Sequence, residues 1–134
     1  MAHQSSASIL SRSRLAVLHV ARKQLGLADD HYRAILLGAG GVTTELYQDV
    51  ALRLLPLDRA EARGMIDSLK CSALLKGFRG RPVADTEALA DTILSFADMA
   101  ANLDGRLKEA EINPVFVLPR GQGVRAGDGL VVLE

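Results

Sequence analysis

The sequence predicts an α/β fold in which a mixed β-sheet is flanked by helices, with an added helix at the N-terminus. Three observations lead to this expectation. The 134 residues are 49% hydrophobic but only 4% aromatic, which suits one compact domain with an aliphatic core. Near the C-terminus apolar residues alternate with polar ones, as in a strand with one buried face. In two other stretches apolar residues recur at helical spacing, so helices are expected to cover the sheet.

Composition and charge narrow the classes of function. Sixteen basic residues balance sixteen acidic ones, so net charge gives no argument for nucleic-acid or membrane binding. The single cysteine, Cys71, excludes an internal disulfide and is interpreted as a small buried residue rather than a catalytic thiol. Residues 1–8 are polar and no apolar run reaches the length of a membrane span. We therefore expect a cytoplasmic protein without a membrane partner.

The first 32 residues are expected to form an N-terminal arm that contains a helix at about residues 11–25. Helical spacing is seen at Leu15, Leu18, Ala21, Arg22 and Leu25. His19 is interpreted as a hydrogen-bonded histidine on a helix face rather than as a ligand. The basic side chains of this arm could touch nucleic acid, but a solvated face is the preferred interpretation; they are Arg12, Arg14, Arg22 and Lys23.

The middle of the chain reads as two strands followed by two helices. A buried strand is expected at residues 33–37, before the glycine turn 38–41, and strand character continues over 42–55. The glycines do not match the dinucleotide fingerprint G-x-G-x-x-G, because Thr43 occupies the position of the third glycine. They do not match the P-loop either, because no Gly-Lys-Ser/Thr follows. Asp58 and Glu61 form a capping box for a helix over about residues 59–69, and the longest helix is expected at 85–103.

A loop at residues 77–82 carries two arginines between glycines. Arg79 and Arg81 could bind phosphate, because guanidinium groups give paired donors and glycine exposes backbone N–H groups. On composition alone, a plain connector is the preferred interpretation of this loop.

The stretch 109–128 carries the strongest candidate site. Alternation places Glu109, Glu111 and Asn113 on one side of a strand. On the other side it places Ala110, Ile112 and Phe116. Pro114 is expected to break the strand. If a hairpin centres on residues 120–121, Asn113 lies nearly opposite Asp128, and two carboxylates and an amide oxygen converge. Magnesium prefers such oxygens, usually together with nucleotide phosphate and waters, although a solvated hairpin with scattered acids remains the alternative.

Several blocks of the chain, in the same order, resemble a known family. They are Ala-Ile-Leu-Leu-Gly-Ala-Gly-Gly-Val (34–42), the run from Glu45 to Leu57, the run from Ala73 to Pro82, and Glu-Ala-Glu-Ile-Asn-Pro (109–114) with Asp128. Residues from about 33 to 134 look like the C-terminal ATP-grasp subdomain of NDP-forming acyl-CoA synthetases, relatives of the succinyl-CoA synthetase β chain. The N-terminal arm resembles, over one short block, the start of a small phage regulatory protein family.

The resemblance implies a set of functional residues and a cofactor. Glu111, Asn113 and Asp128 match the family's magnesium–nucleotide ligands, so the implied cofactor is Mg²⁺ with ATP or ADP. Glu45 and Arg53 match residues near the phosphate-transfer site and are weaker catalytic candidates. The family's Asp-Ala after the hairpin is Asp128-Gly129 here.

The same resemblance implies a partial module. The subdomain that carries the lysine and the glycine-rich loop over the nucleotide is not matched in these 134 residues, and neither is the CoA-binding part. The expected function is half of the Mg-nucleotide site of an acid–thiol ligase, inactive alone, with another chain supplying the other half. The alternative is a non-catalytic remnant that self-associates or binds a partner. A homo-oligomer is expected because half of a cleft exposes apolar surface, and nucleic acid is not an expected partner.

Overall fold

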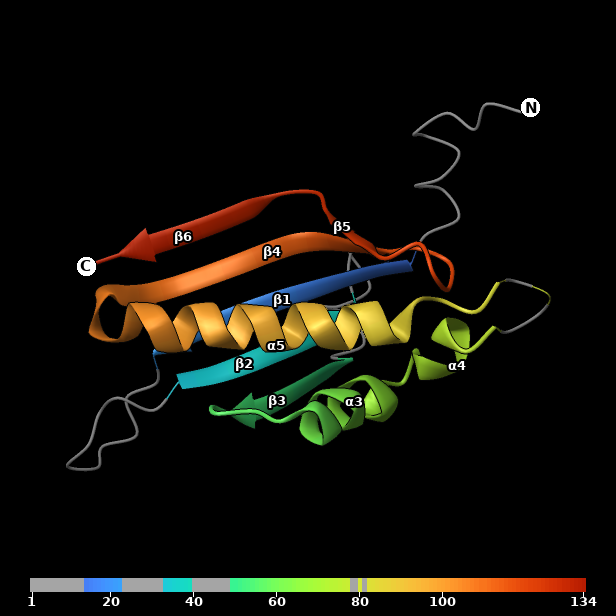
Figure 1. The fold of residues 1–134 in the computed structure, drawn as a ribbon, viewed down its shortest axis with the longest axis horizontal. Helices are drawn as coiled ribbons and strands as arrows, with labels where there is room; N and C mark the ends of the chain where they lie inside the picture. Colours follow the sequence, from blue (N-terminus) through green and yellow to red (C-terminus); the bar gives the residue numbers. More distant parts are fainter. Residues whose placement is uncertain (1–13, 23–32, 40–48, 78–79, 81) are drawn as a thin grey trace.

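A computed structural model describes residues 14–22, 33–39, 49–77, 80 and 82–134, and shows a six-stranded sheet with helices on one face (Figure 1). The strands are β1 (Arg14–Arg22), β2 (Arg33–Ala39), β3 (Val50–Leu54), β4 (Leu107–Val117), β5 (Val124–Ala126) and β6 (Gly129–Leu133). The helices are α3 (Arg59–Ser68), α4 (Ser72–Leu75) and α5 (Thr86–Leu103), with the 3-10 turn η2 (Asp104–Arg106). The strand order is β3-β2-β1-β4-β5, with β6 also paired to β4, and all pairings between the described strands are antiparallel.

The expected N-terminal helix is wrong. Residues 14–22 form β1, which lies between β2 and β4 in the middle of the sheet. Leu18 and Val20 are fully buried against the helices. Val17 points to the opposite face and is nearly buried too, with 9% of its surface exposed. A central strand with apolar residues on both faces loses the clear alternation of a strand, so its apolar positions also fit a helical period.

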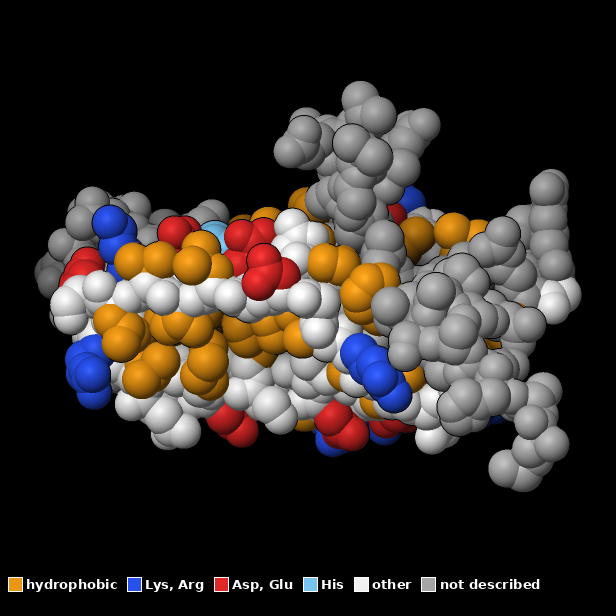
Figure 2. Space-filling view, turned by 90° about the horizontal axis from the view of Figure 1, so that it is seen from above, with side chains coloured by type: hydrophobic (Ala, Val, Ile, Leu, Met, Phe, Trp, Pro, Cys, Tyr) orange, Lys and Arg blue, Asp and Glu red, His pale blue; other side chains and the backbone are white. Residues whose placement is uncertain are grey.

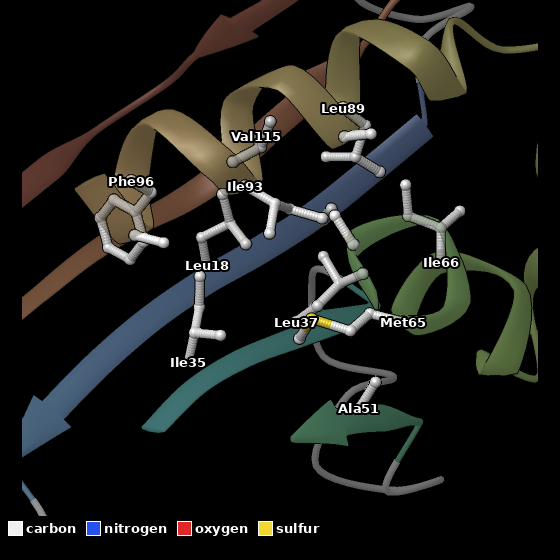
Figure 3. Close-up of a cluster of buried hydrophobic side chains, with 14 of the residues drawn as sticks. Leu18, Ile35, Leu37, Ala51, Met65, Ile66, Leu89, Ile93, Phe96 and Val115 are labelled. Atoms are coloured by element: carbon white, nitrogen blue, oxygen red, sulfur yellow. The ribbon is translucent and has the colours of Figure 1, made fainter. Parts of the chain in front are cut away.

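The core lies between the sheet and the helices α3 and α5. Figure 3 shows Leu18, Ile35 and Leu37 of the sheet meeting Ile93 and Phe96 of α5 and Met65 of α3. The cluster is almost entirely aliphatic, as the composition predicts. Cys71 is half-buried at its margin.

The predicted strand at 33–37 and both predicted helices are confirmed, as β2, α3 and α5. Asp58 caps α3 as expected, because its Oδ1 accepts a hydrogen bond from the Glu61 N–H at 2.7 Å. Of the strand character predicted over 42–55, residues 50–54 form β3. Among the described residues, no helix is long and apolar enough to cross a membrane.

Strand β4 differs from the prediction in two ways. It runs through Pro114 without a break, with a cis peptide bond between Asn113 and Pro114. The next residue to reach the core is Val115 rather than Phe116, which lies outside the buried cluster. The register explains the change of face: Ala16 and Leu18 of β1 pair with Val115 and Ile112, so β4 holds one extra residue there. Such a β-bulge reverses which residues face the core.

Candidate functional site

The three oxygen-bearing residues predicted from the hairpin come together in the structure. Glu111 and Asn113 lie on β4, and Asp128 lies between β5 and β6. The backbone N–H of Asn113 donates to the carbonyl oxygen of Asp128 at 3.1 Å, so the two residues stand opposite each other. The Asn113 side chain donates from Nδ2 to Glu111 Oε1 at 3.3 Å. The predicted convergence of two carboxylates and one amide is therefore present.

These side chains surround a shallow hollow on the face of the sheet that the helices leave open. Its volume is about 190 Å³, and its lining is Glu111, Asn113, Asp128, Gly129 and Leu130. Asp128 Oδ1 accepts a hydrogen bond from the Gly129 N–H at 2.9 Å, which fixes the carboxylate. Seen from the β6 edge, acidic side chains gather beside a histidine (Figure 2). The hollow is open to solvent, because Asn113 and Asp128 are exposed and Glu111 is half-exposed.

The donor set fits magnesium better than a softer metal. Each of the three side chains carries an oxygen, and hard cations prefer carboxylate and amide oxygens. In the described part of the chain, no three His, Cys, Asp or Glu side chains form a metal-binding group. A cation here would therefore depend on the amide oxygen of Asn113 as its third protein donor, with further ligands from outside the chain.

The sequence interpretation missed His19 as a neighbour of this site. In β1 it is the register partner of Glu111 on β4, and its Nε2 lies 3.4 Å from Glu109 Oε2. Paired residues on adjacent strands face the same side, so His19 lies on the open face with both acids. The one signal in the sequence was that His19 is the single polar residue within the apolar run 15–21.

The weaker candidate residues are not brought to this site within the described residues. Arg53 lies on β3, paired with the core residue Ile35, so it faces the helix side of the sheet. Its Nη1 donates to the carbonyl oxygen of Leu52 at 2.8 Å. Glu45, Arg79 and Arg81 lie outside the described residues.

Asp85 supports the hairpin from the other side of the molecule. Its Oδ2 accepts hydrogen bonds from the N–H groups of Gly121 and Gly123 at 3.0 and 2.8 Å, in the turn between β4 and β5. Its Oδ1 accepts from the Ala88 N–H at 3.2 Å in the first turn of α5. One carboxylate thus joins the start of the longest helix to the turn that sets the β4–β5 register.

A second charged group lies on the helix side and has a structural explanation. Arg63 of α3 donates from Nε and Nη2 to Glu87 of α5 at 3.0 and 2.9 Å. This hydrogen-bonded pairing lowers the pKa of Glu87 from its ordinary value of 4.5 and raises that of Arg63. Arg59 extends the network to Glu87 and Asp91. The group is a solvent-exposed clamp between two helices.

Comparisons with known proteins agree with this geometry. A family model described as an ATP-grasp domain matches residues 28–133. The acetate–CoA ligase (ADP-forming) II subunit beta of Pyrococcus furiosus is 35% identical over 112 residues, which cover 82% of this chain and 48% of that protein. The 4-hydroxybutyrate–CoA ligase (ADP-forming) of Nitrosopumilus maritimus is 36% identical over 94 residues, which cover 70% of this chain and 13% of that protein.

Solved structures give the same result. The structure of PH1788 from Pyrococcus horikoshii has a TM-score of 0.82 at 30% identity, covering 90% of this chain and 48% of that chain. The dinucleotide-forming acetyl-coenzyme A synthetase 1 of Ca. Korarchaeum cryptofilum, in complex with coenzyme A and Mg-AMPPCP, has a TM-score of 0.80 at 28% identity. That match covers 90% of this chain and 53% of the other. The chain thus spans about half the length, or less, of the curated relatives it matches.

Proposed function

Because the chain belongs to the ATP-grasp family and is related to the ADP-forming acyl-CoA ligases, we propose that it supplies one half of a Mg-nucleotide site in such a ligase. The observation that carries this proposal is the convergence of Glu111, Asn113 and Asp128 around one hollow. A structural relative in complex with Mg-AMPPCP supports the choice of ligand.

The three residues divide the work of holding a magnesium–polyphosphate. The carboxylates of Glu111 and Asp128 supply negative charge, and the Asn113 amide supplies a neutral oxygen, so the hollow offers a donor set that a hard cation accepts. The Gly129 N–H donates a hydrogen bond to Oδ1 of Asp128, and the second carboxylate oxygen, Oδ2, would be the one to bind the cation. When bound, magnesium neutralises the polyphosphate and keeps it in line for phosphoryl transfer.

The other half of the site must come from outside this stretch of chain. The hollow is open, and a nucleotide bound there would be covered on one side only, whereas small-molecule sites usually enclose most of the ligand. We infer that a second polypeptide region, corresponding to the part of the relatives that this chain does not match, closes the site and completes the ligase.

The test is a calorimetric titration of the chain with Mg-ADP, with EDTA as the metal control. We expect binding that EDTA abolishes. Glu111→Gln and Asp128→Asn should each weaken it about tenfold or more, since even outer-shell metal partners are worth that much. Asp98→Asn is the matched control, because Asp98 is an exposed acid on α5. Mg-ADP binding that is unchanged in both site variants would refute the assignment.

A second function is favoured by the exposed apolar side chains at the two edges of the sheet. On β3 they are Val50, Leu52 and Leu54, and on β6 they are Leu130, Val131 and Leu133, each between 42% and 54% exposed. Such surface often marks a protein interface. A non-catalytic module that self-associates or binds a partner would use it. Sedimentation of the chain without nucleotide tests this: an oligomer that Leu52→Asp dissociates supports it, and a monomer excludes self-association.

A further inference from the structure

Three acidic side chains share the open face near the hollow, but only two of them line it. Glu109 and Glu111 are two residues apart on β4 and so face the same way. Asp128 joins them from the segment between β5 and β6, where its carbonyl oxygen accepts a hydrogen bond from the Asn113 N–H of β4. The lining contains Glu111 and Asp128 but not Glu109.

A contact with His19 explains why Glu109 does not line the hollow. Its carboxylate lies 3.4 Å from His19 Nε2, on the β1 side of β4 and away from the hollow, which lies on the β6 side. Across the sheet, His19 has two register partners, Glu111 on β4 and the apolar Leu36 on β2. Both Glu109 and Glu111 thus lie on its face, and the side-chain contact of His19 is with Glu109. The two side chains are 33% and 43% exposed, so neither is held by burial alone.

We propose that His19 is a positioning residue that keeps Glu109 out of the hollow and so sets the charge of the cation site. This inference rests on the proposed Mg-nucleotide function. With His19 in place, the hollow offers two carboxylates and one amide. Without it, the flexible Glu109 side chain is free to turn along β4 toward Glu111, and the hollow gains a third carboxylate.

The number of carboxylates decides which ligand the hollow prefers. Calcium accepts six to eight oxygens in flexible geometry, and its affinity rises with the number of charged ligands. Magnesium keeps waters and substrate phosphates and uses only one or two carboxylates. A third carboxylate also repels the polyphosphate directly. His19 is thus a specificity-determining residue: it favours magnesium with a nucleotide over a bare calcium ion.

The experiment compares His19→Ala with His19→Gln, each with and without Glu109→Gln. The glutamine amide reaches about as far as Nε2 and can keep the hydrogen bond to Glu109, so His19→Gln is the conservative control. Two dissociation constants are measured by calorimetry for each variant, one for Ca²⁺ alone and one for Mg-ADP. Thermal melting shows that every variant is folded.

We expect His19→Ala to bind Ca²⁺ about threefold to tenfold more tightly and Mg-ADP more weakly by a similar factor, the size of effect of one solvent-exposed charge. His19→Gln should behave like the wild type. Adding Glu109→Gln to His19→Ala should restore both constants, because the third carboxylate is then absent. If His19 only stabilised the fold, the two dissociation constants would not shift in opposite directions in His19→Ala, and Glu109→Gln would not restore them.

The outcomes separate this inference from the proposed function. Unchanged constants in His19→Ala, or shifts that Glu109→Gln does not reverse, overturn the role of His19 and leave the Mg-ADP binding of the wild type standing. If the wild type binds no Mg-ADP, the proposed function fails, but the calcium titration still decides: a gain in His19→Ala that Glu109→Gln removes supports the positioning role, and the absence of a gain overturns it.

Discussion

The two faces of the sheet do different work, although the same strands build both. Leu18 and His19 are adjacent in β1, yet Leu18 is fully buried against the helices and His19 lies on the open face beside two acids. On the covered face, side chains fill the space between sheet and helices (Figure 3). On the open face, apolar side chains at the sheet edges stay exposed. The difference indicates that the covered face stabilises the fold and that the open face is the one available for ligand contacts.

The open face also changes in character from one edge to the other. The backbone register joins one row of residues across five strands: Leu52, Leu36, His19, Glu111 and Leu130. The row begins apolar at the β3 edge, becomes charged at β4 and ends apolar at the β6 edge. A nucleotide bound at β4 and a protein partner bound at β3 would therefore use separate parts of one surface.

The largest expected effect is on the covered face. Ile93→Ala should lower the free energy of unfolding by about 2–5 kcal/mol, because Ile93 is fully buried and its removal leaves a cavity. Leu52→Ala on the open face is the matched control and should cost less than about 1 kcal/mol, since Leu52 is 43% exposed. Urea unfolding of both variants measures the contrast. Equal losses would mean that the open face is covered in solution.

The next effect concerns the join between the helix layer and the hairpin. Asp85→Ala removes the cap of α5 and two hydrogen bonds to the turn at Gly121 and Gly123, and should cost about 1–3 kcal/mol. Hydrogen exchange should speed up most at Gly121 and Gly123, whose N–H groups lose their acceptor. Asp98→Ala is the control. Uniform acceleration over the whole chain would argue against a local join.

Neutralising the site acids should change stability very little. Glu111→Gln and Asp128→Asn lie on the open face and should stay within about 0.5 kcal/mol of the wild type in urea unfolding, as exposed substitutions usually do. If either loses as much as Ile93→Ala, the hollow contributes to the fold and the division of work between the faces fails.

The smallest effect is expected at the exposed clamp between α3 and α5. The hydrogen bond from Arg63 lowers the pKa of Glu87 below 4.5, so the folded state favours the charged carboxylate. Its stabilising contribution is present above pH 4.5 and is lost as the pH falls through the lowered pKa. Glu87→Gln should therefore be slightly less stable than the wild type at pH 7 and equal to it at strongly acidic pH, by urea unfolding at both. If the stability difference between the wild type and Glu87→Gln grew as the pH fell, the pairing with Arg63 would not be what stabilises the charged carboxylate.

The local elements with strong capping or periodic signals could be predicted from the sequence. Asp58 and Glu61 indicated the start of α3, and the apolar stripe of α5 indicated its length. The convergence of Asn113 and Asp128 was also predicted, because a turn between neighbouring strands fixes their register locally. These features depend on residues close together in the chain.

Features that depend on distant partners could not be predicted. β1 is a strand because β2 and β4 hydrogen-bond to its two sides, and neither pairing is visible in residues 14–22 alone. The bulge that turns Val115 rather than Phe116 into the core arises from the pairing of β4 with β1. The place of His19 beside Glu109 follows from the same pairing. Because residues 14–22 were predicted as a helix, His19 was not predicted to lie next to the site.

The central position of β1 also affects how the chain folds during synthesis. His19 and Glu109 are 90 residues apart, so β1 leaves the ribosome long before β4 exists. At about 5–20 residues per second, its second hydrogen-bonding edge stays unpaired for roughly 5 to 20 seconds. During that interval an apolar strand with an open edge can pair with other chains. The strand that completes the sheet is therefore also where aggregation of nascent chains is expected to begin.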